Sequence, residues 1–359
     1  MNKAVFFLGA GATIDVVPGA PSNKDLVKKA LEDFKETPEG KEIWYFVDDL
    51  FHQREFPPTD NQIWNLLDFI VQQGKSASLK YNLERIVELR NSLLNLVIKE
   101  FKRSLNPETT PINTYDNFAR LIATSHSSII STNYDIFIDN ALVKNDCFDY
   151  GAKLRLPVFV SSSARLGFSV KGFRRATEGG ETRLNTGNIK LLKIHGSLNW
   201  LYCRKCDEVD ITMGEKFEAD ALKELHCVHN YCTNKYEPLL ITPTMFKNYE
   251  NRIIKETWDC AEKELIDADN LVFIGYALKD EDYQIRCLLM KALLNKKKNY
   301  QKVIVIDKKP DNNDNQVRLE ENIGNKYRDL YGNGVVRFET IGFTEFVNKI
   351  SEFDLGLDN

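Results

Sequence analysis

The residues with the clearest chemical potential lie in the stretch KIHGSLNWLYCRKC, from Lys193 to Cys206. An apolar run ends there in His195-Gly196. A histidine titrates near neutral pH, so at the carboxyl end of a strand it is placed to accept a proton from a ligand hydroxyl. A histidine that is only capped or buried in the core has the same local sequence, and the residue alone does not separate the two interpretations.

Four of the seven cysteines form two close pairs after this histidine. Two residues separate Cys203 from Cys206, and a gap of twenty residues leads to Cys227 and Cys232. A structural zinc ribbon needs two such pairs, because four thiolates must converge tetrahedrally on the ion. The second pair is the wider one, so His229 could replace one thiolate. Four protein ligands leave no open position, and we therefore expect a structural Zn²⁺ rather than a catalytic one.

A glycine turn stands near the N-terminus, where the apolar run VFFL leads into Gly9-Ala10-Gly11-Ala12-Thr13. Glycines let the backbone approach a pyrophosphate, and the start of a following helix supplies N–H donors. Ile14 occupies the place of the third glycine of the GxGxxG pattern. The turn therefore indicates either dinucleotide binding or a plain tight turn.

Five further candidates stand directly after apolar runs: Asn133, Asp135, Gly275, Tyr276 and Asp307. Asparagine offers both a donor and an acceptor, so it can hold a ribose hydroxyl or a water. The alternative is an Asx-turn that closes the strand. In doubly wound sheets ligands bind beyond the carboxyl ends of the strands. We therefore expect these residues to gather with the histidine at one edge of a sheet.

Short apolar runs that alternate with helical stretches predict the α/β fold class, with a Rossmann-like, doubly wound parallel sheet. We assign this sheet domain to residues 1–21, 114–198 and 238–359. Residues 22–113 carry apolar side chains at helical spacing and are too many for a simple crossover, so we predict a helical insertion there. Residues 199–237 form the predicted zinc-ribbon module.

Composition narrows the class of protein. The chain has 359 residues, 43% of them hydrophobic and 28% charged, which is ordinary for a soluble globular protein. The formal net charge of −4 argues against direct nucleic-acid binding. No apolar run approaches the roughly 20 residues that span a bilayer, and the N-terminal run is too short for a signal peptide. We expect a cytoplasmic protein without a membrane partner. The basic stretch 151–190 suits either a solvated loop or a flap over an anionic ligand.

Glycine turn, strand-end asparagine, strand-end His-Gly and paired cysteines follow one another in the order found in the sirtuin family, which this chain resembles. The resemblance implies NAD as substrate and Zn²⁺ as a structural ion. It implies catalytic roles for Asn133 and His195. The implied NAD-binding residues are Gly9, Ala10, Gly11, Thr13, Asp135, Gly275, Tyr276 and Asp307, and the implied zinc ligands are Cys203, Cys206, Cys227 and Cys232.

Two departures matter. The Phe-Gly-Glu-x-Leu-Pro segment with which protein deacylases bind an acyl-lysine peptide is absent from residues 238–250, and the helical insertion is foreign to those enzymes. The sequence segments HGSLNW, STNYD and GYALKDEDYQIRCLL resemble instead the prokaryotic antiphage-defence branch of sirtuin-like proteins. There the domain hydrolyses NAD, often as an oligomer and often with a translocase-type ATPase partner.

These features predict an NAD⁺ glycohydrolase that gives nicotinamide and ADP-ribose. Nicotinamide leaves as a neutral group, so the paired carboxylates of ordinary glycosidases are not required. We expect antiphage defence by NAD depletion, gated by homo-oligomer assembly or by a partner. The long amphipathic helix expected from Leu83 to Phe101 motivates the assembly. The alternatives are an NAD-dependent protein deacylase and a non-catalytic sensor of NAD or ADP-ribose.

Overall fold

The computed structural model describes residues 2–17, 19–22, 26–51, 60–105, 113–144, 148–151, 189–211, 226–227, 232–244, 246–247, 249–308 and 320–357. The chain divides into two compact units. The first comprises Met1–Pro18, Pro107–Leu240 and Glu250–Asn359, and the second comprises Gly19–Asn106 and Ile241–Tyr249. Among the described helices, none has the length and apolarity needed to cross a bilayer. The basic stretch and His229 fall largely or wholly outside the described residues.

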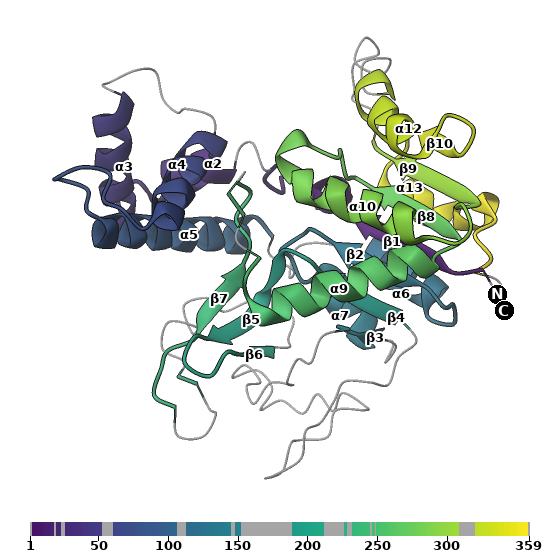
Figure 1. The fold of residues 1–359 in the computed structure, drawn as a ribbon, viewed down its shortest axis with the longest axis horizontal. Helices are drawn as coiled ribbons and strands as arrows, with labels where there is room; N and C mark the ends of the chain where they lie inside the picture. Colours follow the sequence, from purple (N-terminus) through teal and green to yellow (C-terminus); the bar gives the residue numbers. More distant parts are fainter. Residues whose placement is uncertain are drawn as a thin grey trace. The chain divides into compact units, whose positions relative to one another are not determined.

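The first unit is built on a seven-stranded sheet in which every pairing is parallel. Its spatial order is β10-β9-β8-β1-β2-β4-β3 (Figure 1). The strands are β1 (Ala4–Leu8), β2 (Ser128–Ser131), β3 (Phe148–Asp149), β4 (Ile189–Lys193), β8 (Asn270–Ile274), β9 (Lys302–Ile306) and β10 (Val336–Glu339). From β1 the chain winds first to one side and later, from β8, to the other. The predicted doubly wound, Rossmann-like fold is confirmed, with its switch point between β1 and β8.

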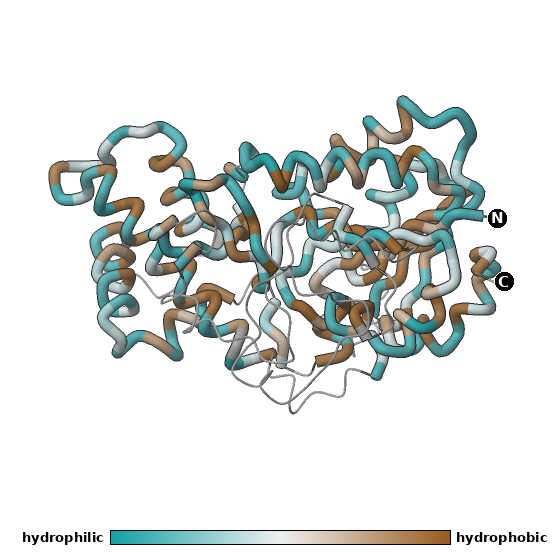
Figure 2. Tube along the Cα trace, turned by 90° about the horizontal axis from the view of Figure 1, so that it is seen from below, coloured by the Kyte–Doolittle hydropathy of each residue, from teal (hydrophilic) through white to brown (hydrophobic). Residues whose placement is uncertain are grey.

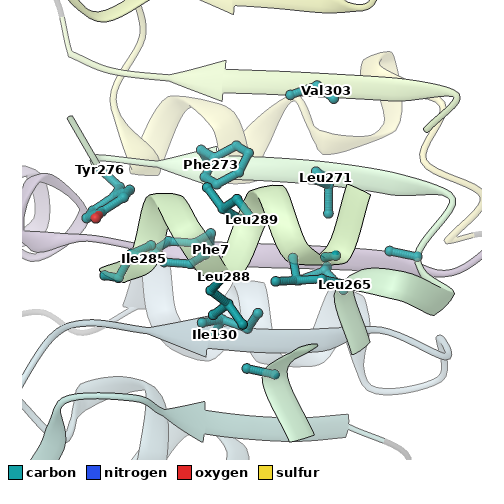
Figure 3. Packing of buried hydrophobic residues seen from close by; sticks show 14 of the residues in the cluster. Phe7, Ile130, Leu265, Leu271, Phe273, Tyr276, Ile285, Leu288, Leu289 and Val303 are labelled. Carbon is teal, nitrogen blue, oxygen red and sulfur yellow. The ribbon is translucent and has the colours of Figure 1, made fainter. Parts of the chain in front are cut away.

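Apolar strands suit this sheet because helices cover both of its faces. Successive residues of a strand point to opposite faces, and Phe6 meets the ring of Phe118 on one face, 5.0 Å between centroids. On the other face Phe7 packs with Phe273, Leu288 and their neighbours in the main core (Figure 3). The helices and helical turns of this unit are α1 (Ala10–Val16), α6 (Asn113–Ile122), α7 (Phe137–Lys144), α9 (Arg252–Asp267), η2 (Asp280–Asp282), α10 (Tyr283–Asn295), η3 (Glu320–Gly324), α12 (Asn325–Tyr331), α13 (Phe343–Asn348) and η4 (Ile350–Phe353).

A small antiparallel sheet carries the cysteines. Its order is β6-β5-β7, with β5 (Gly196–Cys203), β6 (Glu208–Ile211) and β7 (Glu237–Leu240). The chain passes from β4 into β5 through Ile194 and His195 only. Gly196 makes this passage possible: its φ is +76°, and a Cβ there would lie 2.0 Å from the carbonyl oxygen of Leu239. A side chain at this position would clash with backbone in addition to straining φ.

The described part of the second unit contains four helices: α2 (Leu26–Phe34), α3 (Pro38–Phe51), α4 (Asp60–Gln73) and α5 (Leu83–Ser104). They confirm the helical character predicted for this part of the chain. Helix α5 begins after Asn82, whose side-chain oxygen accepts a hydrogen bond from the amide of Arg85 at 2.8 Å. This is a standard N-cap. Hydropathy alternates along the helical segments, as expected for amphipathic helices packed around a core (Figure 2).

Helix α5 packs against each of the other three helices of its unit. Its residues Leu89, Leu93 and Leu96 are buried there. The apolar face that suggested oligomer formation is therefore used inside the unit, and it gives no support to assembly.

The segment Ile241–Tyr249, which directly follows β7, also belongs to this helical unit. Buried Asp68 of α4 accepts hydrogen bonds from the hydroxyls of Thr242 (2.6 Å) and Thr244 (3.0 Å). The same carboxylate pairs with Arg90 of α5. This polar cluster anchors the segment after β7 to helices α4 and α5 of its own unit.

Candidate functional site

The predicted residues follow the carboxyl ends of adjacent strands. Hydrogen bonds continue the sheet past its last paired residues: Gly275 N donates to Ile306 O (2.8 Å), Gly9 N to Ile274 O (2.9 Å), Thr132 N to Leu8 O (3.0 Å) and Ile194 N to Ser131 O (3.1 Å). The order along this edge is thus Asp307, Gly275, Gly9, Asn133 and His195. Adjacent strands lie about 4.8 Å apart, so the row spans the length scale of a dinucleotide.

The glycine turns after β1 and β8 interlock at the switch point. Gly11 N donates to Gly275 O at 2.9 Å. A Cβ on Gly9 would lie 2.5 Å from Gly275 O, and a Cβ on Gly275 would lie 2.2 Å from Ala12 N. Gly275 also has a φ of +60°. Close packing of two backbones therefore accounts for these glycines.

Asn133 has a fixed amide orientation. Its Nδ2 donates to Gly9 O at 2.9 Å and to Thr13 Oγ1 at 3.1 Å. A carbonyl oxygen can only accept, so the NH₂ group must face Gly9. Both N–H groups are thereby used within the protein. No described residue donates to Asn133 Oδ1, and this oxygen is the part of the amide available to accept a proton from a water or a hydroxyl.

Thr13 is the centre of the network that holds Asn133. Its hydroxyl donates to Asp135 Oδ2 at 2.7 Å, and Tyr115 Oη lies 3.0 Å from Thr13 Oγ1. Because the single proton of Thr13 goes to Asp135, Tyr115 must be the donor to Thr13. Burial raises the pKa of Asp135 above its usual range, although the nearby Lys193 ammonium opposes the rise.

His195 occupies the two-residue connection between β4 and β5 and is buried. The carbonyl oxygen of its neighbour Ile194 accepts a hydrogen bond from Trp258 Nε1 at 2.8 Å. The start of β5 is joined to the asparagine segment, since Leu198 N donates to Tyr134 O at 2.9 Å. The fold thus brings the histidine and asparagine segments side by side.

Asp307 and Tyr276 stand on the far side of the glycine turns from Asn133. Asp307 is half-buried, and burial raises the pKa of its carboxyl to about 6, opposed by a hydrogen bond from the backbone of Lys308. The Tyr276 ring packs 4.7 Å from that of Phe7 in the core (Figure 3). The Tyr276 side chain thus lies in the core, its main-chain oxygen accepts a hydrogen bond from Tyr327 Oη at 2.6 Å, and its contact with NAD stays a prediction.

The four cysteines converge as predicted. The Sγ atoms of Cys203 and Cys232 are 3.7 Å apart, and those of Cys206 and Cys227 are 3.6 Å apart. All four lie within 4.8 Å of one another. Tetrahedral zinc with Zn–S bonds of about 2.3 Å requires sulfur–sulfur distances of roughly 3.8 Å. The donor set therefore fits a structural Zn²⁺ without a fifth ligand.

Sequence reasoning missed three residues of the site: Tyr115, Asp139 and Lys193. Tyr115 comes from α6 and belongs to the first unit. Lys193 and Asp139 form a fully buried ion pair at 3.2 Å. The available signal was a lysine at the end of the apolar pair Leu191-Leu192, because buried lysines are rare unless paired.

The family model for the SIR2-like domain matches residues 127–327, more than half of the chain. The match includes Asn133, His195, the four cysteines, Gly275 and Asp307. The chain belongs to the SIR2-like family.

Solved structures of similar chains include a Sir2 homologue mutant in complex with ADP-ribose. It is 13% identical, with 99% of this chain and 94% of that chain covered and a TM-score of 0.45. Another is a Sir2 mutant with a p53 peptide and NAD, 12% identical over the same shares, with a TM-score of 0.39. No curated protein matches the chain.

Proposed function

We propose that the chain binds NAD⁺ along the carboxyl edge of its sheet and hydrolyses the bond between nicotinamide and ribose. Membership of the SIR2-like family supports NAD as the substrate. The observation that carries the proposal is the orientation of Asn133, whose Nδ2 is held by Gly9 O and Thr13 Oγ1. Its Oδ1 is thereby presented as a fixed acceptor for a water or a ribose hydroxyl.

The chemistry follows from this arrangement. The bond from ribose C1′ to the pyridinium nitrogen breaks, its electron pair stays with nicotinamide, and positive charge develops on the ribose. Asn133 orients a water by accepting one of its protons in a hydrogen bond, so that a lone pair faces C1′. As the water oxygen bonds to C1′, His195 accepts the proton that the water loses. The products are nicotinamide and ADP-ribose.

The row of strand ends supports one direction of binding. Asn133 lies one strand from Gly9, and Asp307 lies two strands from it on the other side. With the pyrophosphate over the glycine turn, the nicotinamide ribose would lie beside Asn133 and the adenosine ribose beside Asp307. The Asp307 carboxylate would accept from a ribose hydroxyl.

Hydrolysis is favoured over protein deacylation by the path of the chain after β7. A deacylase needs a segment there that pairs with an acyl-lysine peptide. Here Thr242 and Thr244 instead bind Asp68 within the helical unit. We further propose antiphage defence by NAD depletion, gated by homo-oligomer assembly or by a translocase-type ATPase partner. The proposed role in defence is supported by the resemblance of HGSLNW and STNYD to that prokaryotic branch. Helix α5 gives no support to assembly, because its apolar face is buried within its own unit.

The test is incubation of the purified full chain with NAD⁺, with and without candidate partners, followed by chromatography for nicotinamide. We expect Asn133→Ala and His195→Ala each to abolish NAD loss while the thermal midpoint is kept. Asn295→Ala, on an exposed helix end, is the matched control and should retain full activity. Full activity in either site variant would refute the assignment. Formation of 2′-O-acyl-ADP-ribose from an acetyl-lysine peptide would instead identify a deacylase, and stoichiometric binding without turnover would identify a sensor.

A further inference from the structure

A buried ion pair lies beneath the site and has no place in the chemistry described above. Lys193, the last residue of β4, and Asp139, in the first turn of α7, are both 0% exposed. Lys193 Nζ lies 3.2 Å from Asp139 Oδ2. The other carboxylate oxygen accepts a hydrogen bond from Tyr150 Oη at 2.6 Å. Asn199 Nδ2 lies 3.4 Å from the same tyrosine oxygen.

This arrangement is costly for a position that could be apolar. The neighbours of Lys193 along β4, Leu191 and Leu192, are fully buried apolar residues. Removing two charges from water carries a large desolvation penalty, and well-packed apolar residues of similar volume are often at least as stabilising as a buried pair. Stability of the sheet therefore does not explain why a lysine stands at this strand end.

A second contact of Lys193 gives a reason. Its ammonium also donates to the main-chain oxygen of Asp135. Asp135 lies two residues after Asn133, and Lys193 itself lies two residues before His195. One fully buried cation thus links the segment of the water-orienting asparagine to the strand end that carries the histidine. Asp139 neutralises this cation and fixes its position.

We propose that Lys193, held by Asp139 and Tyr150, is a positioning residue that sets the distance between the Asn133 and His195 segments. The proposal rests on the proposed NAD hydrolysis for its catalytic consequence. Misplacement of a catalytic group by about 1 Å can lower turnover by roughly a hundredfold. We call Lys193, Asp139 and Tyr150 together the strut. Loss of the strut should lower kcat and leave the KM for NAD nearly unchanged, because Lys193 itself touches no substrate.

The central variant is Lys193→Met combined with Asp139→Leu and Tyr150→Phe. Removing one charge alone would leave the other buried and unpaired, and a loss of activity could then reflect unfolding. The triple variant removes both charges and the tyrosine hydroxyl while keeping apolar volume. We expect a thermal midpoint near that of the wild type, a kcat at least tenfold lower and a KM within about threefold. Wild-type kcat in this folded variant would overturn the proposal.

Hydrogen exchange gives a readout that does not need turnover. The amide of Leu198 donates to Tyr134 O across the two segments. Exchange in peptides covering residues 131–137 and 196–199 should be at least tenfold faster in the triple variant, while β8 stays protected. Unchanged exchange would overturn the strut even if the wild type did not cleave NAD, whereas an inactive wild type would refute only the proposed function.

Two further variants complete the design. Asp139→Asn keeps the shape of the side chain but leaves the Lys193 charge buried and unpaired, so its kcat is compared only after circular dichroism has shown that the variant is folded. It should lower kcat severalfold at unchanged KM, and unchanged kcat would count against the strut. Glu264→Gln is the matched control, because Glu264 is buried and pairs with Lys3 (2.8 Å) and Lys190 (2.6 Å) at the opposite, amino end of the sheet. It should lower stability without changing kcat.

Discussion

The glycine turns allow a quantitative prediction of how much stability an added methyl group costs. Three glycines separate the two causes of that cost, a positive φ and a clash of the added Cβ with backbone atoms. Gly332 has a φ of +90° and nothing within 4 Å of an added Cβ. Gly9 has an ordinary φ of −111°, but its Cβ would lie 2.5 Å from Gly275 O. Gly275 combines both problems, with a φ of +60° and a Cβ 2.2 Å from Ala12 N.

Alanine at each position should therefore lower the free energy of unfolding by a different amount. A left-handed backbone such as that of Gly275 costs an L-residue about 1–2 kcal/mol. Gly332, with φ +90° and ψ 147°, lies in a region open essentially to glycine alone, so Gly332→Ala should lose about 1–3 kcal/mol. Overpacking costs about 1–3 kcal/mol, which is the expected loss for Gly9→Ala. Gly275→Ala should lose the sum, about 2–5 kcal/mol. The close backbone contact of Gly275 leaves the clash little room to relax.

Urea unfolding monitored by circular dichroism measures these losses. The ranking should place Gly275→Ala as the most destabilised of the three. Gly9→Ala and Gly275→Ala should also lose NAD cleavage at temperatures where they remain folded, because both displace the glycine turn beside Asn133. Gly332→Ala should keep NAD cleavage. A Gly9→Ala variant as stable as the wild type would show that the two turns are not packed as described, and the reasoning would fail.

Two other predictions concern Asp307 and the cysteines. Since burial raises the pKa of Asp307 to about 6, the folded state binds this proton more tightly than the unfolded chain. The wild type should therefore lose stability relative to Asp307→Asn as pH rises from about 4 to 6. The KM for NAD should rise as pH falls through about 6 in the wild type only, and a pH-independent difference between the two proteins would contradict both expectations. Elemental analysis should find about one Zn²⁺ per chain, and Cys203→Ser should lose the metal and lower the thermal midpoint. Metal-free protein of unchanged stability would rule out a structural zinc site.

Much of the site could be predicted because a parallel sheet converts sequence position into spatial position. Each buried strand appears as a short apolar run, and the residue that follows it must lie at the carboxyl edge. Gly9, Asn133, Gly275 and Asp307 were found in this way, and the structure confirms that they follow the four successive strands β1, β2, β8 and β9 of the order β9-β8-β1-β2. The cysteine cluster could also be predicted from the sequence, because two close cysteine pairs at the spacing of a zinc ribbon indicate a metal site.

What escaped prediction depends on contacts between residues far apart in the chain. The orientation of the Asn133 amide is set by Gly9 and Thr13, more than a hundred residues earlier. Tyr115 gives no chemical signal of its own until α6 places its hydroxyl on Thr13. The amphipathic face of α5 was visible, but only packing could show that α2, α3 and α4 cover it.

The sequence by itself therefore determined the class of fold, the strand ends that carry the candidate site and the four cysteines that could hold a metal, because these depend on local patterns of apolarity and spacing. The tertiary structure alone decided which atom of Asn133 remains available. It alone decided that Lys193 is a buried cation paired with Asp139 and bonded to the main-chain oxygen of Asp135, and that Gly9 and Gly275 exclude any side chain. Hydrogen-bond direction, charge burial and steric exclusion arise only when distant segments meet, so no pattern along the chain encodes them locally.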